Sequence, residues 1–295
     1  PVTVPAVAVG ARIGHDDSVN SRKVFIVSAF PSKICFYGCG NMGGAMLRGW
    51  LAANVAPTTF HIIDPVAENL PEGVHLHRSS AALDTGFDVI ILGIKPQLLA
   101  ELAPEIARIL APGATLISIL AGTTTDTLSA YFPDARIIRL MPNLAAAIGK
   151  SPLGVFAPHD DAQQRAEMAS LLAPLGAVIW IDDEAHMDAV TALAGSGPAF
   201  VYRFIDALTQ GGEAAGLPRA IAAQLALAMT EGAAILAATS SETPTDLARR
   251  VTSPGGTTAA GLAVLDSDAA LNKLITDTLR AARDRGAELA KGDGT

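Results

Sequence analysis

Residues 34–43 read ICFYGCGNMG, a short, largely apolar run followed by a turn whose glycines are spaced G-x-G-x-x-G. The apolar run has the length of a strand, and residues 42–53 have helical spacing. In such a strand–turn–helix unit, Gly38 permits the tight turn, Gly40 lets a pyrophosphate approach the backbone, and Gly43 allows close packing of helix on strand. The stretch predicts dinucleotide binding, and a glycine turn without a ligand is the alternative.

The same strand and helix pattern repeats on both sides of this turn. Runs of strand length, bounded by Gly, Pro or Asp, occur at 34–37, 60–63, 89–94, 115–120, 137–140 and 178–181, with helical segments at 42–53 and 97–110 between them. Alternation of this kind predicts a mainly parallel sheet covered by helices on both faces. Residues beyond 182 are rich in Ala and Leu with helical spacing and lack strand-like runs.

We therefore expect an α/β protein with three parts. Residues 1–32 form an N-terminal extension of unknown role, residues 33–182 a Rossmann-type dinucleotide-binding domain, and residues 183–295 an all-α domain. The helical part is short and very apolar, so we expect partner subunits to help to bury it.

The composition excludes several classes of protein. Half of the 295 residues are hydrophobic and 17% are charged, which is enough for a sizeable core, and the net charge of −8 disfavours nucleic-acid binding. The longest fully apolar stretches run about seven or eight residues, well short of the roughly 20 that cross a bilayer, and residues 1–32 do not resemble a secretory signal. Cys35 and Cys39 are too close together for a good disulfide. These features predict a soluble, cytoplasmic protein that does not interact with membranes.

Asp64 ends the second predicted strand, 21 residues after Gly43. A carboxylate at this point bonds the ribose hydroxyls of NAD and repels the 2′-phosphate of NADP, although Asp-Pro is also an ordinary turn. The nearest following cation is Arg78, so the local chemistry favours NADH.

Gly93-Ile94-Lys95-Pro96 ends another very apolar strand. A lysine at the carboxyl end of the sheet would lie beside the cofactor cleft. A solvated lysine before a proline that starts a helix explains the same residues, and both readings stay open.

Residues 253–258, Ser-Pro-Gly-Gly-Thr-Thr, form a glycine-rich turn that leads into a helix. Glycine amides and hydroxyls at a helix N-terminus make an anion site, and a small carboxylate is its natural guest because the nucleotide has its own turn. An ordinary helix cap is the alternative. Gly195–Pro198 has the composition of a helix kink or a close helix crossing.

These segments together closely resemble the pyrroline-5-carboxylate reductase family. The resemblance covers about residues 34–289 and is carried by the first glycine turn, 89–97, 118–122 and Met141-Pro142-Asn143, and most specifically by 195–199 and 253–258. The chain departs from the family in having Leu144-Ala145-Ala146 after Asn143, where Thr-Pro-Ala is usual, and Phe200 in place of tyrosine.

The resemblance implies NADPH- or NADH-dependent reduction of Δ1-pyrroline-5-carboxylate to L-proline, the final step of proline biosynthesis, by a Rossmann domain joined to a helical dimerisation domain. Dimers of this family often assemble further, commonly into decamers. The implied cofactor residues are Tyr37, Gly38, Cys39, Gly40, Asn41, Met42, Gly93, Ile94, Lys95, Pro96 and Asn143, to which the dinucleotide pattern adds Gly43 and Asp64. The implied substrate residues are Ser253, Gly255, Gly256, Thr257 and Thr258, with Thr258 as the catalytic residue.

The expected chemistry needs few ionisable groups. A protonated imine accepts hydride readily, so the Thr258 hydroxyl or a water that it holds can suffice. No metal is expected, because the histidines lack ligand spacing, and His75 and His77 are expected to form a solvent-facing pair on a strand. Family members more often prefer NADPH, which opposes the Asp64 argument, so the preference stays open.

Two rival functions are weaker. A β-hydroxyacid dehydrogenase resembles this chain at the first glycine turn but needs a lysine on the first interdomain helix, and no lysine lies between Lys150 and Lys273. A non-catalytic redox sensor would have no need of the turn at 253–258.

Overall fold

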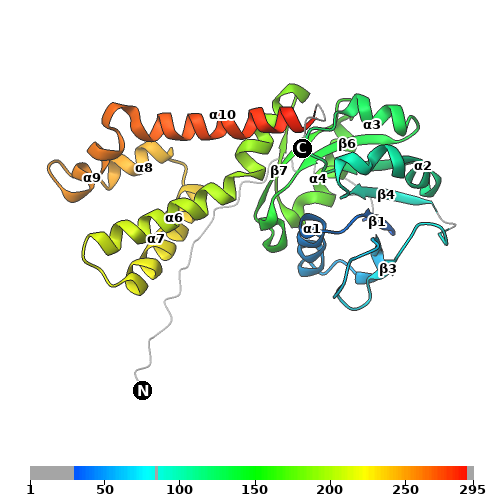
Figure 1. Cartoon of the computed structure of the whole chain (residues 1–295), viewed down its shortest axis with the longest axis horizontal. Coiled ribbons are helices and arrows are strands. Elements are labelled where there is room, and N and C mark those ends of the chain that lie inside the picture. The colour runs from blue at the N-terminus through cyan, green and yellow to red at the C-terminus, as the bar shows by residue number, and fades with distance from the viewer. Residues whose placement is uncertain (1–29, 84–85, 291–295) are drawn as a thin grey trace, which may run out of the picture.

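The computed structural model describes residues 30–83 and 86–290. Its N-terminal part is built on one eight-stranded sheet in the order β3-β2-β1-β4-β5-β6-β7-β8 (Figure 1). The strands are β1 (Ile34–Tyr37), β2 (Phe60–Ile63), β3 (His75–His77), β4 (Phe87–Leu92), β5 (Leu110–Ser118), β6 (Arg136–Met141), β7 (Ser151–Phe156) and β8 (Gly176–Trp180). The strands β1 to β6 pair in parallel with one another. The strand β7 is antiparallel to β6, and β8 is parallel to β7.

Most of these strands lie where the apolar runs predict them. The strands β1 and β2 coincide with the predicted residues, whereas β4 and β5 begin and end earlier. No strand is predicted at β7, because Pro152 and Gly154 interrupt its apolar pattern, and both residues disfavour strand interiors. The mainly parallel sheet is confirmed.

Both faces of the sheet are buried, as β1 illustrates. Ile34 and Phe36 pack on one face and Cys35 and Tyr37 on the other, because successive side chains of a strand point in opposite directions. The covering helices are α1 (Asn41–Ala52) and α4 (Ala162–Leu172) on the Phe36 face and α2 (Leu99–Ile109) and α3 (Thr125–Tyr131) on the Tyr37 face. The two-faced covering expected from the alternating elements is confirmed.

The described residues after β8 are mainly helical. The elements are α5 (Met187–Val190), a π-helical segment (Thr191–Gly195), α6 (Gly197–Ala214), α7 (Arg219–Thr239), α8 (Pro244–Arg250), α9 (Thr257–Leu265) and α10 (Ala270–Ala290). The helices α6 and α7 pack together as a hairpin, and the long α10 returns to the sheet domain, where it packs against α5 and the π-helical segment (Figure 1). This places α8 and α9 at the far end of the molecule from the sheet.

The helical part buries little of its own apolar surface. Among the described residues of α6 and α7, only Thr209, Ala222 and Ala226 are buried. The large side chains that stay exposed, called here the uncovered apolar surface, include Tyr202, Phe204, Leu225, Met229, Ile235 and Leu274. A single chain therefore leaves these helices without a closed core.

By length and composition, α7 alone among the helices of residues 30–83 and 86–290 could cross a membrane. Three polar side chains, Gln224, Thr230 and Glu231, lie in its interior turns. The helix also packs along α6 as one half of a helical hairpin.

Candidate active site

The two loops predicted to hold the cofactor meet at the centre of the sheet edge. They follow β1 and β4, which are adjacent strands, with β2 and β3 on one side and β5 and β6 on the other. Gly38 has φ +84°, and a Cβ there would lie 2.8 Å from the carbonyl oxygen of Gly93. A Cβ on Gly93 would in turn lie 2.4 Å from the Gly38 oxygen. Only glycine at both positions allows this contact, at the point where parallel sheets bind ligands.

Beyond this contact the glycine turn is open. Gly40 ends the turn and precedes α1, and a Cβ built on it would meet no atom within 4 Å. No side chain caps α1, so its first amides face the turn. Gly43 is buried, and a Cβ built on it would lie 3.4 Å from the Gly38 oxygen and from the Phe36 ring, while Asn41 is exposed and Met42 half-buried. An open glycine backbone at an uncapped helix start fits a pyrophosphate, so the residues present fit a dinucleotide.

Asp64 is held within the protein. Its Oδ2 accepts a hydrogen bond from the Cys39 amide at 2.8 Å, and its Oδ1 accepts from the Val66 and Ala67 amides at 2.9 Å each. The residue is buried, and it ties the glycine turn to the turn after β2. Burial, followed by the nearby Asp64 charge, raises the pKa of the Cys39 thiol to about 11, so this cysteine stays a neutral thiol. Both Cys35 and Cys39 are free.

Tyr37 and the loop after β4 contribute in different ways. The Tyr37 hydroxyl donates to Glu105 of α2 at 3.0 Å, so its side chain supports the sheet face, and its backbone oxygen accepts from Gly93. Ile94 is half-buried, and Lys95 and Pro96 are exposed at the carboxyl edge beside the glycine turn. The position expected for Lys95 is therefore the one observed, while its role stays a prediction.

Asn143 couples the sheet to the helical part. Its side-chain Nδ2 donates to the Ala194 carbonyl at 2.9 Å, its Oδ1 accepts from the Ala145 amide, and its own amide donates to the Ser151 hydroxyl. The residue is buried, so the side-chain amide is engaged inside the protein. Contact of Asn143 with a cofactor stays a prediction, whereas its hydrogen bond to the π-helical segment is observed.

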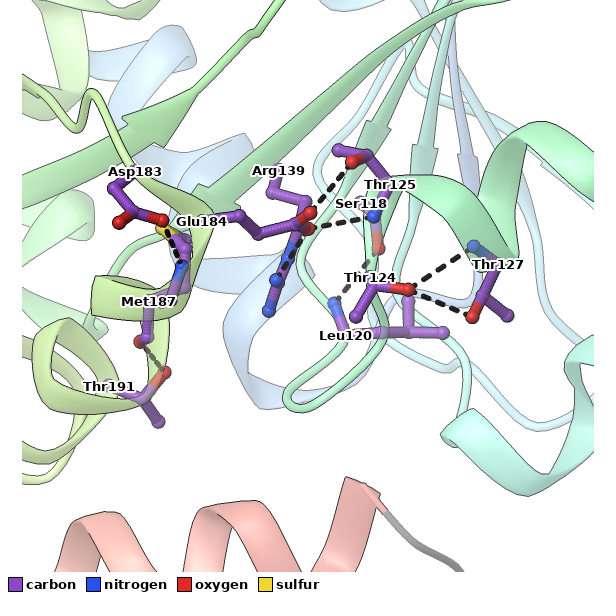
Figure 2. A network of polar contacts seen from close by, with 11 residues as sticks. Ser118, Leu120, Thr124, Thr125, Thr127, Arg139, Asp183, Glu184, Met187 and Thr191 are labelled. Carbon is purple, nitrogen blue, oxygen red and sulfur yellow. Dashed lines mark hydrogen bonds and ion pairs between the residues drawn. The ribbon is translucent and has the colours of Figure 1, made fainter.

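A second, charged connection joins the same two parts (Figure 2). Glu184, at the start of the helical part, accepts from Arg139 Nη1 of β6 at 2.7 Å and from the amide and hydroxyl of Thr125 at 2.7 and 2.8 Å. The sequence reasoning missed this network. The signal was an arginine inside the apolar run of β6, because a charge in a buried strand needs a partner.

The turn at 253–258 has the predicted local form. Gly255 has φ +68°, the Gly256 amide donates to the Ser253 carbonyl at 3.0 Å, and Thr257 begins α9. Ser253, Thr257 and Thr258 are exposed, and no side chain caps α9. The ordinary-cap alternative, in which the hydroxyls bond their own helix, is therefore not what the structure has.

Within one chain, however, the two halves of the predicted site do not meet. The helix α9 lies at the opposite end of the molecule from β1 and α1, beyond the hairpin of α6 and α7 (Figure 1). A substrate held by residues 253–258 of this chain would be far from its own glycine turn.

Comparison with known proteins identifies the family to which the chain belongs. A family model described as pyrroline-5-carboxylate reductase dimerisation matches residues 184–289, and one described as NADP oxidoreductase, coenzyme F420-dependent, matches residues 33–122. Pyrroline-5-carboxylate reductase of Pseudomonas aeruginosa is 35% identical over 266 residues, 88% of this chain and 97% of the relative. The chain belongs to the pyrroline-5-carboxylate reductase family.

Solved structures of pyrroline-5-carboxylate reductases share its architecture. That from Coxiella burnetii has a TM-score of 0.80 at 31% identity, and that from Plasmodium falciparum, with NADP bound, has a TM-score of 0.75 at 25% identity. Each comparison covers 88% of this chain and 98% of the other. The fold is thus the family's α/β dinucleotide-binding domain followed by an all-α dimerisation domain.

Three histidines, His61, His75 and His77, form a cluster at the far edge of the sheet. His75 and His77 lie on β3 as predicted, but their rings stack on His61 of β2, with centroids 4.6 and 5.4 Å away, so the expectation of a simple solvent-facing pair is incomplete. Parallel pairing of β2 with β3 brings them together. Within residues 30–83 and 86–290, no group of three or more His, Cys, Asp or Glu side chains could hold a metal ion.

Proposed function

We propose that the protein reduces Δ1-pyrroline-5-carboxylate to L-proline with NADPH or NADH, the final step of proline biosynthesis. The observation that carries the proposal is the uncapped turn at 253–258, which the chain retains together with an open glycine turn. A redox sensor would need only the second of these. The family match over nearly the whole described chain supports the same reaction.

The cofactor side belongs to a domain that we place at residues 33–182. The amides of the turn at 38–43 hold the pyrophosphate at the start of α1, and residues 93–96 line the nicotinamide end. Bound NAD(P)H supplies a hydride to the imine carbon of the substrate. Asn143 acts here by fixing the π-helical segment, through its hydrogen bond to Ala194.

The substrate side belongs to a helical domain that we place at residues 183–295. The backbone amides and hydroxyls at Ser253, Gly255, Gly256 and Thr257 bind the substrate carboxylate at the start of α9. The exposed Thr258 hydroxyl bonds the ring nitrogen and stabilises the amine that forms there, so it is the catalytic residue. No stronger acid is required, because the protonated imine is already electron-poor.

The two halves are brought together by a second copy of the chain. The turn at 253–258 of one protomer approaches the glycine turn of its partner, and the uncovered apolar surface is buried between them. This arrangement explains both the separation of the two turns within one chain and the exposed Leu225, Met229 and Ile235. A homodimer is the minimum unit, and dimers of this kind can build a decamer. With two free cysteines and a net charge of −8, the assembly suits the cytoplasm.

The test is to measure NADPH and NADH oxidation separately, each with pyrroline-5-carboxylate. Turnover is expected with at least one nucleotide, and Thr258→Ala should lower kcat/KM at least about tenfold with cofactor binding unchanged. Thr239→Ala is the matched control, since that hydroxyl is exposed and bonds its own helix. Cofactor binding without turnover would refute the reductase assignment and favour another imine or a sensor.

A further inference from the structure

The parallel pairing of β2 and β3 places an arginine beside the adenosine end of the cofactor site. Ile63 pairs with His77, so the residues that follow, Asp64 and Arg78, lie next to each other at the carboxyl edge of the sheet. In sequence, Arg78 is remote from the turn that ends β2. In the folded protein, its guanidinium lies against that turn.

Arg78 is anchored there by one nitrogen. Its Nη1 donates to the carbonyl oxygens of Ala67 at 2.7 Å, Pro65 at 3.2 Å and Asp64 at 3.4 Å. Its Nε and Nη2 make no hydrogen bond within the described part of the chain. The guanidinium is thus fixed on the turn at 64–67 and retains donors for a ligand.

Asp64 is poorly placed to exclude a phosphate. Three backbone amides already donate to its two oxygens, and the residue is 8% exposed. Its charge is spread over these donors, and one lone-pair position of Oδ2 is left for a neutral hydroxyl. Of the two charged side chains that are hydrogen-bonded to the turn at 64–67, the exposed one is therefore the cationic Arg78.

We propose that Arg78 binds the 2′-phosphate of NADPH and sets a preference for NADPH over NADH. The proposal rests on the cofactor site of the proposed function. Arginine is suited to this role because its planar fork bonds phosphate oxygens with two donors at once and stays charged at every physiological pH. Asp64 then organises the glycine turn, and the choice between NADPH and NADH is made by Arg78, which follows the neighbouring strand β3.

The experiment measures nucleotide binding without turnover. Calorimetric titrations compare adenosine 2′,5′-bisphosphate with adenosine 5′-monophosphate, which differ only in the 2′-phosphate, on the intact protein and on Arg78→Gln and Arg78→Lys. Glutamine keeps a donor for the Ala67 carbonyl, and lysine keeps the charge. Arg108→Gln is the matched control, because Arg108 also bonds loop carbonyls, those of Ser80 and Leu83.

We expect the intact protein to bind the bisphosphate at least about tenfold more tightly than the monophosphate. Arg78→Gln should weaken bisphosphate binding about ten- to a hundredfold and leave the monophosphate within about twofold, while Arg78→Lys keeps much of the preference. Equal weakening of both nucleotides, or no preference in the intact protein, would overturn the proposal. Failure of the reductase itself is seen separately, as absent turnover with both dinucleotides despite nucleotide binding.

Discussion

The Arg139–Glu184 pair provides a stringent test of how the two parts of the chain are joined. Glu184→Ala removes the carboxylate that accepts from Arg139 and from both donors of Thr125. The Arg139 side chain is 5% exposed, so water cannot replace the lost partner. Removal of one member of a buried ion pair costs about 3–5 kcal/mol, and we expect a loss of that size in the free energy of unfolding.

The measurement is urea unfolding at one fixed protein concentration, because association also contributes to stability. Glu184→Gln keeps the shape and one acceptor oxygen but not the charge, and its amide nitrogen has to donate to the Thr125 hydroxyl instead of accepting from it, so it should cost about 1–2 kcal/mol. The control is Glu213→Ala, which breaks an ion pair with Arg219 whose side chains are 48% and 59% exposed, and should cost less than about 1 kcal/mol. If Glu184→Ala costs no more than Glu213→Ala, the network does not hold the two parts together.

Three further predictions concern other regions. Gly93→Ala should abolish dinucleotide binding in a calorimetric titration, because the new Cβ would lie 2.4 Å from the Gly38 oxygen. An unchanged affinity would contradict the close contact between the Gly38 and Gly93 loops. Burial, and then the neighbouring histidines, lower the pKa of His61 to about 4, so its stabilising effect is complete above pH 6.5 and lost as the pH falls toward 4. Because the ring is only half-buried we expect a change of about 1 kcal/mol, and His61→Gln should flatten this part of the pH–stability curve, which an unaltered curve would disprove. Ile235→Glu places a charge on the uncovered apolar surface and should shift the protein to monomers in analytical ultracentrifugation; a variant that remains dimeric would exclude this part of α7 from the interface.

The sheet domain could be predicted well from sequence, since its elements are marked by local signals. The glycine spacing at 38–43 and the short apolar runs identify β1, β2 and α1 because turn chemistry and periodicity act over a few residues. The strand β7 could not be found in this way, since its pairing with β6 and β8 outweighs the propensities of Pro152 and Gly154.

The site was harder to predict where it depends on contacts between distant segments. Local chemistry at Asp64 favoured NADH, but the sequence does not show that the carboxylate is occupied by backbone amides. Nor does it show that β3 returns beside β2 and brings Arg78 to the same turn. Both facts depend on strand pairing, which residue spacing does not specify.

The separation of α9 from the glycine turn has a genetic consequence. If each site combines the cofactor half of one chain with the substrate half of another, a gene damaged at residues 253–258 and one damaged at residues 38–43 can complement each other in one cell. Random pairing of the two products would restore about a quarter of the intact sites, although neither product is active alone. Conversely, a chain that is damaged in both halves inactivates only the sites to which it contributes a half.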